Sequence, residues 1–153
     1  MSIQPELSSL EPIGPAQLTP SDERTWAMLA HFSVLVNLFT GALGPLIPLV
    51  MYLSFKDRSR YVAYHAMQSV VFQLIWWAAP GALIGVMWAA TGILSAVIIG
   101  LLCIPFALVL TVVIALMPLA ALIYGVWGAL EAGQGKDFKY WLIGDWMRGT
   151  LTG

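Results

Sequence analysis

The sequence predicts an all-α integral membrane protein, and two observations support this prediction. Hydrophobic residues make up 59% of the chain and charged residues only 10%, whereas roughly a quarter of the residues in a soluble domain are charged. The charges are also confined to residues 6–24, 56–60 and 131–148, so that residues 25–55 and 61–130 carry none. Uncharged stretches of this length are typical of proteins that cross the membrane several times.

The first uncharged stretch, residues 25–55, predicts a short helical hairpin. Residues 19–22, Thr-Pro-Ser-Asp, are typical of a helix start, with a hydroxyl cap, a proline in the first turn and an acid three residues after the cap. A single helix over residues 25–55 would measure about 46 Å, against a hydrocarbon core of about 30 Å. We therefore expect helices over about 21–40 and 45–55, the second being short enough to re-enter the membrane instead of crossing it. The break between them is favoured by Gly41, Gly44, Pro45 and Pro48.

The second uncharged stretch, residues 61–130, predicts two long helices, over about 61–89 and 93–130. Residues 90–92, Ala-Thr-Gly, are the expected turn between them. The last helix is too long to be straight, and Pro105 and Pro118 are the expected places for a kink or a break. A division into three helices at Pro80 is the alternative, but it would put the C-terminus on the opposite face from residues 56–60.

The basic residues predict the topology. Cytoplasmic loops are enriched in Lys and Arg, so Lys56, Arg58 and Arg60 mark the cytoplasmic side. A four-helix transmembrane bundle places the other basic residues, near both termini, on that side as well. We therefore expect cytoplasmic N- and C-termini and a location in the bacterial inner membrane.

The charge pattern also divides the chain into three regions. Residues 1–20 hold four prolines and little apolar sequence, and we expect a disordered cytoplasmic tail. Residues 21–133 form the four-span transmembrane domain. Residues 134–153 interleave aromatic and basic side chains, which is typical of a segment lying in the membrane interface, and Gly144 argues against one continuous helix there.

Polar side chains recur with helical spacing after the basic loop. On a helix, His65 shares a face with Tyr61, Gln68, Ser69 and Gln73, and lipid offers such groups no hydrogen-bond partner. We expect this stripe to pack against other helices or a partner, or else to line a hydrophilic path or ligand site. Asn37, with Ser33 and Thr40, gives the first helix a polar face of its own.

His31 and His65 are the candidates for cofactor binding. Both lie one to two turns past a basic residue, so they fall at similar depth on the same side of a four-pass protein. Two imidazoles can hold a haem, a chlorin or a metal. No third ligand and no recognisable motif accompanies them, and we predict no cofactor and no metal.

Small residues recur at four-residue spacing, which lets helix backbones approach closely. Enzyme signatures are missing: the sequence has no His-Glu-x-x-His, no Gly-x-Ser-x-Gly and no phosphate loop, and its two uncharged stretches hold no carboxylate. The two small-residue ridges are Gly81, Gly85 and Ala89, and Ala121, Gly125 and Ala129.

A family resemblance is carried by four segments. They are residues 22–31 (Asp-Glu-Arg-Thr-Trp-Ala-Met-Leu-Ala-His), residues 45–49 (Pro-Leu-Ile-Pro-Leu), residues 60–62 with 65–70, and residues 135–146. Together they resemble a small bacterial membrane domain related to the four-span, Tic-twenty-type import component of the chloroplast inner envelope. The resemblance implies a four-span fold and, by analogy alone, a part in protein transport. Trp141 departs from the proline usual in that family.

The functional prediction is a non-catalytic integral membrane protein, acting as a small subunit or a translocon-like component of a larger complex. Its partners would be the lipid bilayer and either other membrane proteins or further copies of the chain, without nucleic acid. The competing hypothesis is a cofactor-binding subunit of an electron-transfer or light-harvesting assembly that uses His31 or His65. An intramembrane enzyme is the third.

Overall fold

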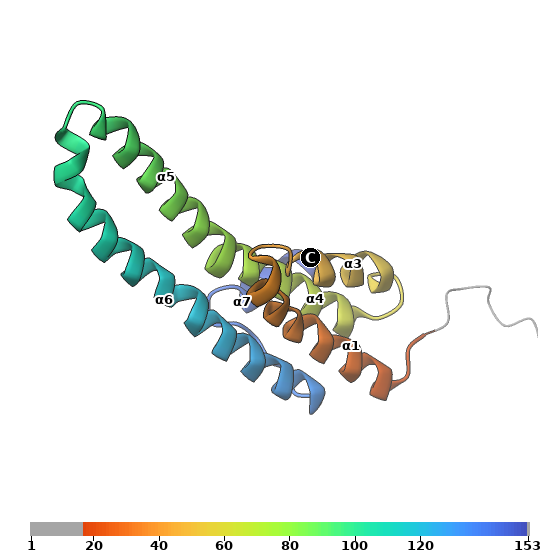
Figure 1. Cartoon of the computed structure of the whole chain (residues 1–153). Coiled ribbons are helices and arrows are strands. Elements are labelled where there is room, and N and C mark those ends of the chain that lie inside the picture. Colours follow the sequence, from red (N-terminus) through yellow and green to blue (C-terminus); the bar gives the residue numbers. More distant parts are fainter. Residues whose placement is uncertain (1–16, 153) are drawn as a thin grey trace, which may run out of the picture.

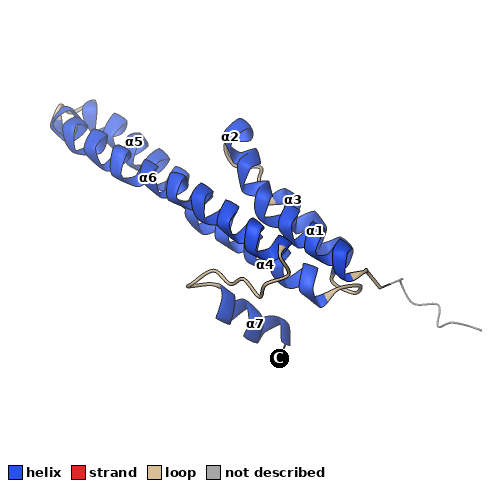
Figure 2. Cartoon of the chain, turned by 90° about the horizontal axis from the view of Figure 1, so that it is seen from below, coloured by secondary structure: helices blue, strands red, loops and turns tan. Residues whose placement is uncertain are grey.

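The computed structural model describes residues 17–152, and every regular element within them is a helix (Figures 1 and 2). Two of these helices are long and apolar enough to cross a membrane, Arg60–Ser95 and Ile99–Gly133, and a shorter apolar helix covers Leu46–Phe55. The all-helical membrane architecture agrees with the prediction. Most of the predicted N-terminal tail lies outside the described residues.

The short hairpin begins and breaks as the sequence predicts. The Thr19 hydroxyl accepts a hydrogen bond from the backbone N–H of Asp22 at 3.2 Å, which caps the first helix. The helical run continues through a 3₁₀ turn and ends at Gly41, whose φ of +77° suits a residue without Cβ. The elements are α1 (Pro20–Phe32), a 3₁₀ turn (Ser33–Val36), α2 (Asn37–Thr40) and α3 (Leu46–Phe55).

A continuous rod of 36 residues follows the basic loop. It consists of α4 (Arg60–Gln73), a π-helical turn (Leu74–Ala78) and α5 (Ala79–Ser95). The predicted turn at residues 90–92 is wrong, because these residues lie inside α5 and the chain reverses at residues 96–98. Thr91 donates its hydroxyl to the carbonyl of Met87 at 2.9 Å, which satisfies it within the helix. Ile98 makes the reversal with a φ of +69°.

The last long helix, α6 (Ile99–Gly133), returns antiparallel to α5 (Figure 1). Neither Pro105 nor Pro118 ends it. Each proline removes one backbone hydrogen bond, but α6 packs along α5 and α1, and this packing holds the helix together. After Gly135 the chain runs without regular structure to Tyr140, turns, and ends in α7 (Gly144–Thr152).

The molecule divides into two parts along its length (Figures 1 and 2). We call residues 79–120 the outer hairpin: α5, the turn at residues 96–98 and residues 99–120 of α6. The body is the rest of the described chain, including α1 to α4, the π-helical turn, residues 121–133 of α6, and residues 134–152, the C-terminal segment. The Trp77 indole N–H donates to the carbonyl of Gly41, so the tip of the short hairpin lies where body and outer hairpin meet. One apolar cluster of the body consists of Ala30, Met51, Phe55, Val62 and Ala66.

Candidate functional site: a buried polar network closed by the C-terminal segment

The two histidines lie side by side inside the body and form a hydrogen-bonded chain with Tyr140. Nε2 of His31 is 3.0 Å from Nδ1 of His65, and Nδ1 of His31 is 2.9 Å from the Tyr140 hydroxyl. Both imidazoles are fully buried. Burial, with the neighbouring Tyr124, raises the pKa of Tyr140 well above its ordinary value, so the phenol keeps its proton.

The donor and acceptor roles along this row of hydrogen bonds follow from counting the polar groups that each arrangement leaves unpaired. When Tyr140 donates to His31 and His31 donates to His65, only the Nε2–H of His65 is left without a partner. The opposite direction would leave both the Tyr140 proton and the His65 Nε2 lone pair unpaired. Within the described residues, Nε2 of His65 is the buried side-chain nitrogen or oxygen that makes no hydrogen bond. The row of hydrogen bonds from Tyr140 through His31 therefore ends at His65, whose Nε2–H is an unpaired donor.

Gln68 fixes the C-terminal segment to α4. Its side-chain oxygen accepts from the backbone N–H of Tyr140 at 2.8 Å, and its nitrogen donates to the carbonyl of Phe138 at 3.3 Å. One side-chain amide thereby satisfies two backbone groups in a stretch without regular structure, where no helical hydrogen bond is available to them. Gln68 itself is fully buried.

Gln73 is the centre of a second polar cluster, one turn and a half further along α4. It accepts from the Asn37 amide at 2.9 Å and donates to the hydroxyls of Ser33 and Ser69 at 2.8 and 3.0 Å. The Asn37 oxygen accepts from the backbone N–H of Gly44 at 2.8 Å. A Cβ at Gly44 would collide with both amides, so this turn requires glycine. The cluster ties both ends of the short hairpin's turn to α4.

Tyr61, the remaining member of the stripe, lies at the edge of the network. Its hydroxyl donates toward the carbonyls of Ala132 and Lys136, at 3.1 and 3.2 Å, where α6 gives way to the C-terminal segment. Every stripe residue named from the sequence thus hydrogen-bonds or packs within one copy of the chain.

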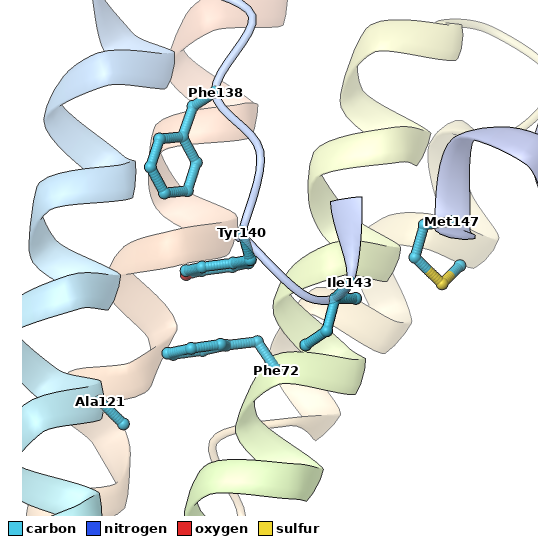
Figure 3. Packing of buried hydrophobic residues seen from close by; sticks show 6 residues of the cluster. All are labelled: Phe72, Ala121, Phe138, Tyr140, Ile143 and Met147. Carbon is cyan, nitrogen blue, oxygen red and sulfur yellow. The ribbon is translucent and has the colours of Figure 1, made fainter. Parts of the chain in front are cut away.

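The C-terminal segment contributes residues that the sequence analysis left out of the site. Tyr140 stacks on Phe72 with ring centroids 3.8 Å apart and planes 2° from parallel (Figure 3). The segment has two faces: Trp141 and Trp146 point outward and are mostly exposed, whereas the other face is interior. The alternation of apolar and polar residues from Phe138 to Tyr140 is the signal that could have revealed this. The interior cluster consists of Phe72, Ala121, Phe138, Tyr140, Ile143 and Met147.

The histidine pair does not fit a haem or chlorin held between two imidazoles, which is one form of the alternative hypothesis. Two axial imidazoles must stand on opposite sides of the macrocycle with the metal between them. Here the two rings are hydrogen-bonded directly to each other, and Tyr140 occupies the other nitrogen of His31. The described residues also hold no cluster of three or more His, Cys, Asp or Glu that could bind a metal ion.

The basic residues of the α3–α4 loop lie at the end of the body away from the outer hairpin. Lys56 and Arg60 are exposed, and Arg58 lies over the ring of Phe55 at 5.7 Å. The C-terminal segment brings Arg148 to the same end, where its guanidinium binds Asp137 at 2.6 Å and also contacts Tyr64. Asp137 and Tyr64 together raise the pKa of Arg148.

Comparison with known families assigns the chain to one of them. The model of the MamF/MmsF family, described as the magnetosome magnetite crystal formation protein family, matches residues 22–147. The chain belongs to this family. No curated protein and no solved structure matches it significantly.

This membership corrects the resemblance drawn from the sequence. The relationship to the Tic-twenty-type import component is wrong, and with it the inference of protein transport. The segments that carried it make a helix start, a helix break, a basic loop and a packed chain end. These features serve any small helical membrane protein of this shape, so they do not identify one family.

Proposed function

We propose that this MamF/MmsF protein is a non-catalytic membrane subunit of a larger assembly that takes part in magnetite crystal formation at the magnetosome. The family description supplies the process and names no enzymatic activity. The role as a subunit rests on one observation: the apolar length of the two long helices exceeds the thickness of a bilayer.

The helical rod is much longer than the hydrocarbon core is thick. The rod from Arg60 to Ser95, 36 residues long, measures about 54 Å, against about 30 Å of hydrocarbon. A tilt of about 40°, the upper end of the usual range, would still leave about 41 Å along the membrane normal. One bilayer therefore covers either the body or the outer hairpin, but not both.

The body is the part that we place in the membrane, as a four-pass bundle with both termini cytoplasmic. Its basic end carries Lys56, Arg60 and Arg148, together with the exposed Trp141 and Trp146, the combination found at a cytoplasmic interface. At the opposite end, Trp76 and Trp77 supply aromatic side chains at about the depth of the second interface. The short hairpin then crosses with its tip near residues 41–45. Because α3 has only ten residues and measures about 15 Å, the turns before and after it must supply the rest of this span.

The outer hairpin then extends beyond the membrane and must be covered by protein. Its surface is apolar: Val86, Ile93, Leu102 and Phe106 are each more than two-thirds exposed. Water-exposed apolar surface of this extent marks a site that binds protein or membrane, and in this placement the bilayer already covers the body. We propose that other membrane proteins of the assembly, or further copies of this chain, cover it.

A shortened outer hairpin tests this role. Deleting residues 84–94 and 105–115 removes about three turns from each arm and keeps the arms in register, because three turns take about 11 residues. The body and its polar network are untouched. The full chain, extracted from native membranes in mild detergent, should migrate in a large assembly, and the shortened chain should migrate alone and fail to support normal crystals. A shortened chain that still migrates in the assembly would refute the docking role.

A further inference from the structure

The basic end of the body holds a pocket of about 520 Å³ between the end of α3, the start of α4 and the C-terminal segment. We propose that this pocket binds the phosphate group of an anionic phospholipid. The inference rests on the proposed placement of the body in the membrane, which sets the pocket at the cytoplasmic interface.

The charge of the pocket favours an anion. Three cations line it, Lys56, Arg60 and Arg148, against two carboxylates, Asp57 and Asp137. Asp137 is already bound through both oxygens to Arg148, at 2.6 and 2.8 Å. The lining thus carries one more positive than negative charge. Arginine and lysine are the usual phosphate-binding side chains.

Hydroxyl groups complete the lining. Tyr52, Tyr61 and Tyr64 all line the pocket. The hydroxyls of Tyr61 and Tyr64 already donate to backbone carbonyls, so Tyr52 is the phenol of this lining that can donate a hydrogen bond to a phosphate oxygen. Tyr61 and Tyr64 are also ring neighbours of His65, with centroids 4.4 and 5.4 Å from its imidazole. His65 is the buried side chain whose Nε2 lacks a partner. The tyrosine wall of the pocket therefore packs against the buried hydrogen-bonded network, although His65 itself does not line the pocket.

The apolar surface beside the pocket selects a lipid over free phosphate. Leu46, Val50 and Leu53 are each more than half exposed, and their spacing puts them on one face of α3. Lys56 continues that face, three residues after Leu53. A headgroup at Lys56 and Arg60 would thus have its acyl chains along the exposed side of α3. Inorganic phosphate gains nothing from this surface.

The test uses the full chain purified in a neutral detergent and titrated with phosphatidylglycerol, followed by native mass spectrometry. We expect a defined one-to-one lipid adduct that phosphatidylcholine does not give. The double variant Lys56→Gln/Arg60→Gln should bind about tenfold more weakly or worse, because it removes charge-assisted hydrogen bonds to the phosphate. Lys139→Gln is the matched control: Lys139 pairs with Asp145 outside the pocket, so this variant should bind as the unchanged protein does.

The outcomes separate the possible sources of the phosphate. Equal binding of phosphatidylcholine, or unchanged binding by the double variant, would refute the proposal. Full displacement of the lipid by millimolar inorganic phosphate would make this a site for free phosphate and would also refute it. Both substituted residues are exposed, and circular dichroism checks that the variant folds; if it does not, Lys56→Gln alone should show a weaker loss of the same kind. The shortened-hairpin chain keeps the pocket, so it should bind lipid while losing assembly, which separates this inference from the docking role.

Discussion

The body and the outer hairpin are both apolar and helical, but different interactions hold them together. In the body, buried amides, imidazoles and hydroxyls join α1, α4 and the C-terminal segment through specific hydrogen bonds. In the outer hairpin, the one side-chain hydrogen bond between the two arms that the described structure shows joins Trp88 to Thr111 at 2.8 Å. Polar contacts in an apolar surrounding fix one arrangement, because any other leaves groups unpaired. The body is thus specified internally, whereas the outer hairpin is left with surface for something else to cover.

The two small-residue ridges show the same contrast. In the body, Ala121 and Ala129 are buried, and a Cβ added at Gly125 would stand 2.8 Å from Cγ1 of Val34. In the outer hairpin, Gly81 and Gly85 have nothing within 4 Å of an added Cβ. Identical spacing in the sequence therefore serves close packing in one region and an open surface in the other.

The largest expected effect concerns which region the membrane covers. In a Cys103→Ser background, cysteines at Ala42 and Ala96 should both react with a membrane-impermeant maleimide from outside, in cells that lack the partners. A cysteine at Asp57 should react only after permeabilisation. If Ala42 is protected while Ala96 reacts, the bilayer covers the outer hairpin, and the four-pass placement of the body is wrong.

The next largest effect is expected for Gln68→Leu. It leaves the Tyr140 N–H and the Phe138 carbonyl buried without partners, which should cost about 2–4 kcal/mol of stability. The measurement is the thermal denaturation midpoint in detergent. Val86→Leu, on the exposed face of the outer hairpin, is the control and should stay within about 0.5 kcal/mol. Equal effects of the two would mean that the network does not stabilise the body.

The glycine ridges give a matched pair of intermediate size. Gly125→Ala should destabilise by about 1–3 kcal/mol, because Val34 must move to admit the methyl group. Gly85→Ala should be neutral or stabilise by up to about 1 kcal/mol, since alanine favours the helix and meets nothing. Both are measured on the chain alone in detergent. The reverse order of effects would overturn the assignment of the two ridges.

The smallest effect is expected inside the outer hairpin. Thr111→Val removes the bond to the Trp88 indole, and the loss should be about 1 kcal/mol or less, as for other hydrogen bonds between membrane helices. Denaturation under the conditions used for Gln68→Leu provides the comparison. A loss as large as that of Gln68→Leu would show that polar contacts specify both regions alike.

The sequence by itself determined the membrane class, the start of the first helix, the break after Thr40 and the shared face of the α4 stripe. Each of these depends on composition or on the geometry of a few neighbouring residues, so it can be predicted without knowing which distant segments come into contact. The turn at residues 96–98 was missed because an ordinary isoleucine, Ile98, makes it, while Thr91 and Gly92 look like a turn but are absorbed into the helix.

Only the tertiary structure decided how distant segments meet. The His31–His65 contact joins residues 34 positions apart, and the His31–Tyr140 contact joins residues 109 apart. Helical spacing shows that a polar face must be satisfied, but it does not name the partner. The C-terminal segment becomes that partner because its backbone meets Gln68 and its tyrosine stacks on Phe72. These are long-range contacts, and their energy depends on the packing of the whole body and not on any local pattern.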